Sequence, residues 1–464
     1  MSDKMRNHNP SLFRYRLLAR IIIEAKSPLA VGSGRDDIES DSMFARDPNG
    51  FPYIPGTSIA GVVRSILDPE KKDGFFGLDK DGGLGSRIIV SDALILDSKS
   101  RVTDGIDPEA SSDELLRKFE FLPVRQHVRI NENGVAERGG KFDNEVVYAG
   151  TRFCFEMEVL VESGESEKFS KVLSAICCNN FMLGGGTRKG YGQVEVVEVK
   201  TARIDMSSIE EVKSYLDKPS QLNESGSWTG WNPADAENNA DNVGCDVYEI
   251  KLKPCDFFMF SSGFGDEYGV ADNIPVREKK VVWKHESGYD SGKLVDGAYV
   301  LIPASSVKGA LLHRTAYYIN ACMGVFADEQ PASGQTNWDS ATKALESLFG
   351  KADENEAVRG NIIISDVFLD EKDVLQKYIN HISVDSFSGG AISGALFTEM
   401  VDFAPDKELT INVIVNKNGT DDCAIMAFER AVSDLCEGLL PLGGGTNRGN
   451  GMFKGKVSKN GKSL

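Results

Sequence analysis

The chain has 464 residues and a formal net charge of −18, because 52 Lys and Arg residues stand against 70 Asp and Glu residues. This length predicts roughly two to four domains, and the hydrophobic fraction of 41% is that of an ordinary globular protein. The charge excludes a uniformly basic coat for nucleic acid, so any such contact has to use local basic strips. No stretch is apolar enough to span a bilayer, and charged residues interrupt the N-terminal apolar stretch, so we expect neither a signal peptide nor a membrane contact.

The eight cysteines form no C-x-x-C pair, and the five histidines are scattered along the chain. A structural zinc site needs clustered thiolate and imidazole ligands, usually at short spacing. The cysteines are therefore expected to be buried free thiols, and this usage predicts a reducing compartment, the cytoplasm.

The predicted elements of the first half begin with a strand over 14–25. The motif P-G-T-S then opens a helix, which Thr57 and Ser58 would cap and whose apolar residues recur at helical spacing. The later elements are strands over 88–95 and 146–159, a helix over 169–181 that a glycine run would stop, and a strand after the glycines.

The second half is predicted to repeat this order. A strand is expected over 247–253, and Ser305 and Ser306 would cap the helix that follows. A strand over 362–369 and a helix over 424–440 precede the second glycine run and a last strand. The order strand–helix–strand–strand–helix–strand is that of a ferredoxin-like domain with insertions, so the predicted fold class is α+β.

Four sequence marks occur twice in the same order, which indicates two tandem copies of one domain. The pairs are YIPGTSIAGVVRSIL (53–67) and LIPASSVKGALLHRT (301–315), SRIIVSDALI (86–95) and GNIIISDVFL (360–369), EVVYAGTRFCFEMEV (145–159) and EMVDFAPDKELTINV (399–413), and LGGGTRKGYGQVEV (183–196) and LGGGTNRGNGMFKG (442–455). We predict a first domain over 1–202, an acidic solvated linker over 203–245 and a second domain over 246–464.

The glycine loops are candidate contacts for an RNA backbone, because glycine lets a backbone approach a ligand and a basic side chain adds charge for a phosphate. The helix starts after P-G-T-S and P-A-S-S add free N–H groups and basic residues. The plainer alternative for each loop is a helix-to-strand turn. The candidate residues are Gly185, Gly186, Thr187, Arg188 and Lys189, then Gly444, Gly445, Thr446, Asn447 and Arg448, and on the helices Arg64, Lys308 and Arg314.

A basic hairpin is predicted over 124–147 from its turn signal, and Arg125, His127 and Arg129 lie on it. The counterpart over 381–401 keeps a glycine turn but lacks the basic residues. Such a hairpin can lie across a nucleic-acid strand, and it can equally be an ordinary exposed loop. The residues alone leave both interpretations open.

Each copy also carries aspartates on the loop before the capped helix, among them Asp41 and Asp272. An aspartate beside an RNA 2′-hydroxyl could bind a divalent ion or assist its deprotonation. A solvated acidic loop is the alternative.

Taken together, these motifs resemble the RAMP superfamily, and most closely the backbone subunits of type III CRISPR effector complexes. The resemblance rests on D-P-N-G-x-P-x-I-P-G-T-S, S-R-I-x-V-S-D-A, E-V-V-x-A-G-T and G-G-G-T-R-K-G-Y-G, and the tandem arrangement is similar to the fused subunits of type III-D-like complexes. It implies two modified ferredoxin-like, RRM-related domains, each with a "thumb" hairpin, over about 124–147 and about 381–401. It further implies CRISPR RNA, target RNA and other type III effector subunits as partners.

In active members of that family, one loop aspartate cleaves target RNA with a divalent metal. Carried over by position, the resemblance gives Asp41 and Asp272 as catalytic and metal-binding residues, with Mg²⁺ as the metal, and a metal-dependent endoribonuclease acting within a complex. Two alternatives remain open: a non-catalytic scaffold for guide RNA, and a guide-processing nuclease that would use His127 as base.

Overall fold

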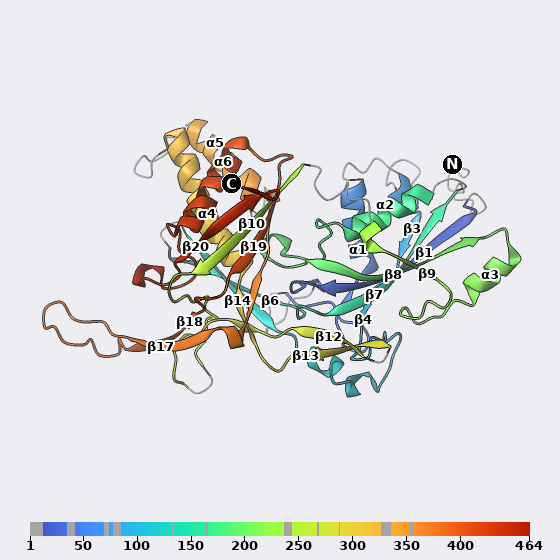
Figure 1. Cartoon of the computed structure of the whole chain (residues 1–464), viewed down its shortest axis with the longest axis horizontal. Helices are drawn as coiled ribbons and strands as arrows, with labels where there is room; N and C mark the ends of the chain where they lie inside the picture. Colours follow the sequence, from blue (N-terminus) through green and yellow to red (C-terminus); the bar gives the residue numbers. More distant parts are fainter. Residues whose placement is uncertain are drawn as a thin grey trace.

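The computed structural model describes residues 13–34, 42–68, 74–77, 85–131, 134–162, 166–235, 244–266, 269–286, 288–325, 336–351 and 357–464. Two halves lie side by side, and helices cover a sheet in each of them (Figure 1). This mixed helix and sheet content confirms the predicted α+β class. No helix in the described part of the chain is long and apolar enough to cross a membrane.

The sheet of the first half has the strand order β2-β4-β7-β1-β8-β9, with β3 also paired to β7. The long strand β1 lies between β7 and β8 and is antiparallel to both. The bounds are β1 (Tyr15–Ala25), β2 (Tyr53–Ile54), α1 (Gly56–Leu67), β3 (Ile88–Val90), β4 (Ala93–Ile95), β5 (Val124–Ile130), β6 (Ala136–Glu145), β7 (Arg152–Val161), α2 (Ser166–Cys177), β8 (Val194–Asp205), α3 (Ile209–Leu216) and β9 (Thr229–Trp231).

The main sheet of the second half has the order β15-β19-β10-β20-β21. In both halves the first predicted strand therefore lies between the third and the last predicted strands: β1 lies between β7 and β8, and β10 lies between β19 and β20. The bounds are β10 (Cys245–Pro254), β11 (Arg277–Glu278), β12 (Val281–Glu286), β13 (Tyr289–Leu294), β14 (Tyr299–Ile302), α4 (Ala304–Met323), α5 (Thr336–Phe349), β15 (Ile362–Ile364), β16 (Val367–Asp370), β17 (Leu375–His381), β18 (Phe397–Phe403), β19 (Leu409–Asn416), α6 (Asp422–Glu437), β20 (Phe453–Lys459) and β21 (Lys462–Ser463).

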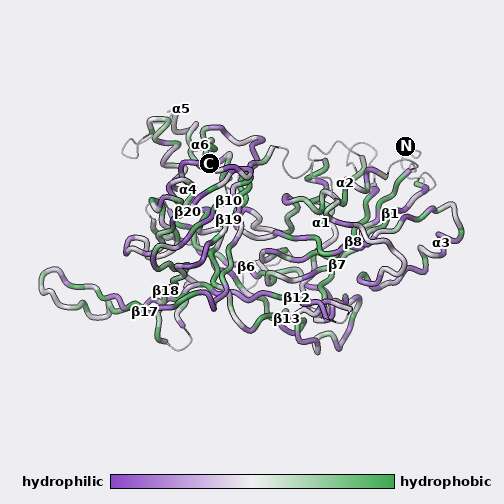
Figure 2. Tube along the Cα trace, viewed as in Figure 1, coloured by the Kyte–Doolittle hydropathy of each residue, from purple (hydrophilic) through white to green (hydrophobic). Residues whose placement is uncertain are grey.

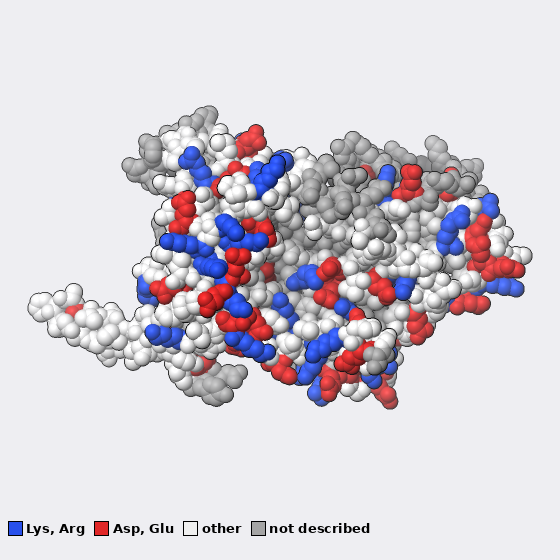
Figure 3. All heavy atoms as spheres, viewed as in Figure 1, with Lys and Arg blue, Asp and Glu red and all other residues white. Residues whose placement is uncertain are grey.

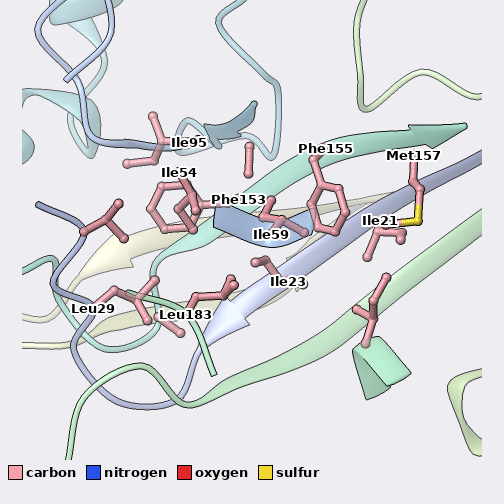
Figure 4. Close-up of a cluster of buried hydrophobic side chains, with 14 of the residues drawn as sticks. Ile21, Ile23, Leu29, Ile54, Ile59, Ile95, Phe153, Phe155, Met157 and Leu183 are labelled. Carbon is pink, nitrogen blue, oxygen red and sulfur yellow. The ribbon is translucent and has the colours of Figure 1, made fainter. Parts of the chain in front are cut away.

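Each half has its own hydrophobic core between sheet and helices. Alternate residues of β1 point to one face because successive side chains of a strand alternate. Figure 4 shows Ile21 and Ile23 of β1 beside Phe153 and Phe155 of β7, with Ile59 of α1 among them. All eight cysteines are free thiols, as predicted, although Cys255 and Cys322 are exposed.

The predicted caps of the two first helices are wrong. Each helix starts two residues earlier than a Thr57 or Ser305 cap requires, at Gly56 and Ala304, after a proline that makes no side-chain cap. The cap comes instead from the S-D motif, because Asp92 Oδ1 accepts the Gly56 N–H at 2.8 Å and Asp366 Oδ1 accepts the Ala304 N–H at 2.8 Å. This turn of the chain divides each predicted strand into two short strands, β3 and β4 in one half and β15 and β16 in the other.

Two further expectations need correction. The segment over 203–245 is not simply a solvated linker, because β8 runs to Asp205, α3 follows, and β9 pairs with β8. The glycine runs do not stop the helices either. The helix α2 ends at Cys177, before the run, and α6 is closed by Gly438 in the left-handed conformation.

The halves are joined by a hairpin of the second half, β12 and β13, that packs on the first half (Figure 1). Val281 and Leu294 from this hairpin belong to the core of the first half, and Trp283 Nε1 donates to the Gly150 carbonyl at 2.7 Å. An ion pair adds to this contact, since Arg152 Nη1 lies 2.6 Å from Asp290 Oδ2. A segment of the second half therefore completes the core of the first half, and we call this segment, residues 281–294, the strap.

Candidate functional site

Both glycine runs form the same tight turn, so the repeat seen in the sequence is also a repeat in backbone shape. A 3-10 turn spans Thr187–Lys189 in the first half and Thr446–Arg448 in the second, each flanked by glycines with positive φ. Gly184 and Gly443 approach a neighbouring carbonyl so closely that an added Cβ would lie 2.4 Å from its oxygen. These glycines are therefore required by packing, which supports the turn interpretation for part of each run.

The first glycine turn brings four cations together at the junction of the halves. Arg188 donates to the Gly360 carbonyl at 3.0 Å, and Lys308 of α4 donates to the Phe349 carbonyl at 3.0 Å. Lys189 and the exposed Arg359 complete this group, which we call the junction cations. In the described part of the chain, none of the four has a carboxylate partner. Concentrated positive charge without a counter-charge is the property that an RNA backbone needs.

The junction cations disfavour one another's charge. Burial and the neighbouring Arg188 and Lys189 lower the pKa of Lys308 to about 8. Burial and Arg359 lower the pKa of Arg188 to about 10, and burial and Arg129 lower the pKa of Lys189. A bound anion would relieve this repulsion, so the group is set up to hold one.

We expect Lys308→Met to raise the free energy of unfolding at pH 7, on the order of 1 kcal/mol, because it removes a charge that the fold disfavours. Since the native pKa lies below the unfolded value, Lys308 destabilises the fold most at low pH, and this cost disappears as pH rises from about 8 towards the unfolded value. Denaturant unfolding of both proteins from pH 7 to 10 should show the advantage of the variant shrinking. An advantage that grows with pH would contradict this assignment.

A second repeated arrangement lies at the base of each hairpin, where a histidine stacks on a phenylalanine and a cation lies over that ring. In the first half His127 stacks on Phe142 with ring centroids 5.0 Å apart, and Lys189 Nζ lies 4.3 Å from the Phe142 centroid. In the second half the corresponding residues are His381, Phe397 and Arg448. Aromatic and cationic surfaces of this kind bind bases and backbone of single-stranded nucleic acid. The two phenylalanines have no local sequence signal, because only the pairing of the hairpin strands brings them against the histidines.

His127 is closer to the glycine loop than its sequence position suggests. Its Nε2 lies 2.5 Å from the hydroxyl of Tyr191, which follows the glycine turn. Burial, with Lys189 and Arg125 nearby, lowers the pKa of His127 to about 4, so the ring is neutral near pH 7. A stacked, hydrogen-bonded and neutral imidazole fits a structural role at the hairpin base.

The aspartate loops correspond in register between the halves. The Ser42 carbonyl accepts from Glu145 N at 3.0 Å, and the Asn273 carbonyl accepts from Met400 N at 2.9 Å. Asp272 directly precedes Asn273, as Asp41 precedes Ser42, so the two aspartates occupy equivalent positions in the chain. Asp41 itself lies outside the described residues.

Asp272 is exposed beside the second hairpin. Its Oδ2 accepts the Thr398 N–H at 2.8 Å, and its own N–H donates to the Thr398 carbonyl at 2.8 Å. Its Oδ1 has no protein partner among the described residues. These residues also contain no group of three His, Cys, Asp or Glu that could hold a metal by themselves. Asp272 therefore fits Mg²⁺ only in the manner in which that ion binds one carboxylate together with waters and substrate phosphates.

The hairpin of the first half lies against the aspartate loop of the second half. Gly263 of this loop lies against Gln126 of β5, and Lys141 of β6 lies 5.9 Å from the ring centroid of Phe264. The candidate site is therefore shared between the halves. The first half supplies the basic hairpin, the second half supplies the Asp272 loop, and both supply junction cations. The hairpin of the second half forms an arm that extends away from the body (Figure 1).

This arm differs in character from the basic hairpin. It begins earlier than the predicted 381–401, because its first strand β17 starts at Leu375. Figure 3 shows it almost free of charged side chains, and hydrophobic stretches continue into it in Figure 2. Its exposed apolar residues include Ile382, Val384, Leu396 and Phe387, whose side chain is fully exposed at 100%.

Several residues predicted to contact RNA instead bind other groups of the protein. Arg125 is buried in an ion-paired site between the halves, and Arg314 is paired with Asp434 on α6, so neither is free for RNA. Arg448 is paired with the buried Glu399, and the N–H groups of Gly185 and Gly444 donate to protein carbonyls. Arg129 remains exposed, 3.6 Å from Glu137, and Arg64 is half-buried with a bond to the Gly77 carbonyl.

The model of the RAMP superfamily matches residues 22–195 and 294–454, which is more than half of the chain. The protein therefore belongs to the RAMP superfamily, with one matched region in each half. It is 28% identical over 212 residues to the CRISPR system Cms endoribonuclease Csm3 of Methanothermobacter thermautotrophicus, covering 38% of this chain and 82% of that protein. It is also 25% identical over 195 residues to the protein of the same name from Methanocaldococcus jannaschii, covering 39% of this chain and 77% of that protein.

Proposed function

We propose that this chain is a guide-RNA-binding backbone subunit of a type III CRISPR effector complex, with two RAMP units in tandem as in type III-D-like systems. The junction cations carry this proposal, since four basic side chains that have no carboxylate partner among the described residues lie where the two units meet. The strand orders of both sheets support a ferredoxin-like core in each unit, with β5–β6 and β17–β18 as thumbs. Guide RNA, target RNA and further effector subunits, in the cytoplasm, are the partners that this proposal requires.

The proposed activity is metal-dependent cleavage of target RNA at Asp41 and Asp272. The 2′-oxygen of a nucleotide attacks its own 3′-phosphate, the bond to the 5′-oxygen breaks, and a cyclic phosphate and a 5′-hydroxyl result. A thumb that splays the target beside the Asp272 loop can hold these atoms in line, which supplies much of the acceleration. Mg²⁺, when bound with Asp272 and a phosphate, would stabilise the negative charge that develops.

Guide binding through the junction cations has a direct test. Each basic residue that contacts a phosphate contributes about one unit to the slope of log affinity against log salt concentration. We expect Arg188→Ala combined with Lys308→Ala to lower that slope by about two and to weaken binding at low salt. Filter binding of guide RNA to the full chain over a range of salt concentrations measures both effects.

Lys343→Ala is the matched control, because Lys343 is an exposed lysine on α5 that is not one of the junction cations. It should leave the slope unchanged. An unaltered slope in the double variant would remove the junction cations from the RNA site.

A further inference from the structure

The contact between the halves is built from two complementary faces. The donor face belongs to the first half and consists of Arg125, at the base of the basic hairpin, and the glycine turn ending at Gly190. The acceptor face belongs to the second half and consists of Asp366, Glu278 and the start of α4. Arg125 Nη1 lies 2.7 Å from Asp366 Oδ2 and Nη2 lies 2.7 Å from Glu278 Oε2, and the side chains of Arg125 and Asp366 are 6% and 0% exposed.

The glycine turn fits the acceptor face so closely that a side chain could not replace Gly190. An added Cβ would lie 2.4 Å from Asp366 Oδ1 and 2.7 Å from the Ala304 Cβ. The donor face therefore seats over the same carboxylate that caps α4. The contact is therefore asymmetric, because the hairpin base of one unit packs on the helix start of the next unit.

The first half carries a second copy of the acceptor face that is not covered. Asp92 caps Gly56 with the geometry that Asp366 uses for Ala304. Arg46 pairs with Pro52 and Arg277 pairs with Val300, and each of these partners lies three residues before the proline that precedes the helix. The two arginines are therefore equivalent, and the residues after them, Asp47 and Glu278, correspond to each other. Asp92 is exposed, and no cation pairs with it in the described ranges.

The second half carries an uncovered donor face, and this copy has lost its arginine. Gly449 corresponds to Gly190 and has nothing within 4 Å of the place of a Cβ. His127 pairs with Phe142 and His381 pairs with Phe397, so the two histidines are equivalent. The residue two positions before each histidine is Arg125 in the first hairpin and Ile379 in the second. Arg448, the basic residue of this turn, is already paired with Glu399. The free donor face therefore has no cation to offer to Asp92 of another copy.

We propose that the face around Asp92 and Asp47 binds a different RAMP-type chain, which presents an arginine from the base of its own hairpin, and that copies of this chain do not join end to end. This inference rests on the proposed function and adds the kind of neighbour and its side.

The test uses the effector complex purified from its source by a tag on the full chain, with Asp92→Asn as the variant. The amide keeps an oxygen for the Gly56 N–H, so the helix cap survives while the charge is lost. We expect the chain adjoining the first half to be depleted at least about tenfold relative to the tagged chain, measured by quantitative mass spectrometry. Asp104→Asn, an exposed aspartate on the same half, is the matched control and should change nothing.

A photo-crosslinker at the exposed Thr57 identifies the neighbour, and we expect it to reach a different RAMP chain next to an arginine. Crosslinks to residues 375–403 of a second copy, end-to-end oligomers of the isolated chain in sedimentation, or a full complement of subunits in Asp92→Asn would each overturn the inference. Guide-RNA binding by the wild-type chain is recorded in the same samples. Its absence would refute the proposed function, whereas intact binding with an unaffected neighbour would refute only the inference about Asp92.

Discussion

Changing both Asp41 and Asp272 to alanine is expected to reduce target-RNA cleavage by the assembled complex at least about a hundredfold. The reason is that each carboxylate is the proposed means of holding the metal beside the attacking 2′-oxygen. Among the described residues, no group of three His, Cys, Asp or Glu side chains could hold the metal in its place. Each single variant should lose its own cut and keep the other. Labelled target RNA with Mg²⁺, resolved by length, separates the two products.

Two control variants distinguish chemistry from folding. Asp272→Asn keeps an oxygen that can accept the Thr398 N–H, so it preserves the loop while weakening the metal contact. It should fail to cut and still assemble. Asp266→Ala changes another aspartate of the same loop and should cut normally. Normal cutting by the double variant, with guide RNA bound, would leave the chain as a scaffold for guide RNA.

Arg125→Ala is expected to cost about 3–5 kcal/mol of stability, because it leaves buried carboxylates without a counter-charge. The side chain of Asp366 is fully buried and that of Glu278 is nearly so, and Arg125 is the ion-pair partner of both. Denaturant unfolding measures this cost through the midpoint and the slope of the transition. We also expect the contact between the halves to be lost at a lower denaturant concentration than either core.

Arg129→Ala is the matched control on the same hairpin, because this side chain is 59% exposed and its loss should cost less than about 1 kcal/mol. Adding Asp366→Asn to Arg125→Ala should recover part of the loss, since the amide still caps Ala304 but carries no charge. A single variant within about 1 kcal/mol of wild type would contradict the role given to Arg125.

The sequence was sufficient for the parts of the fold that depend on local pattern. The strands β1 and β10 and the helices α1 and α6 follow from runs of apolar residues at the right period, and the tandem repeat follows from four ordered motifs. The caps were mistaken because Thr57 and Ser305 satisfy the local rule, whereas the true acceptors, Asp92 and Asp366, lie far along the chain. Their repetition in both S-D motifs was the available signal.

The candidate site was predicted less completely, because its chemistry depends on contacts between the halves. A basic residue on a hairpin looks like an RNA contact in sequence, yet Arg125 faces two carboxylates of the other half. Conversely, Arg188 and Lys308 belong to different halves, and only the packing of the glycine turn against α4 makes them one group. Side chains that acquire their role from tertiary contacts leave no local pattern to read.

The strap has a consequence for synthesis of the protein. Val281 and Leu294 fill the core of a unit whose own strands end some fifty residues earlier, so the ribosome must deliver residue 294 before that core is complete. Units of a nascent chain otherwise finish folding in the order in which they emerge. Here the first unit waits for the second, which ties their maturation together and disfavours a stable product from a prematurely terminated message.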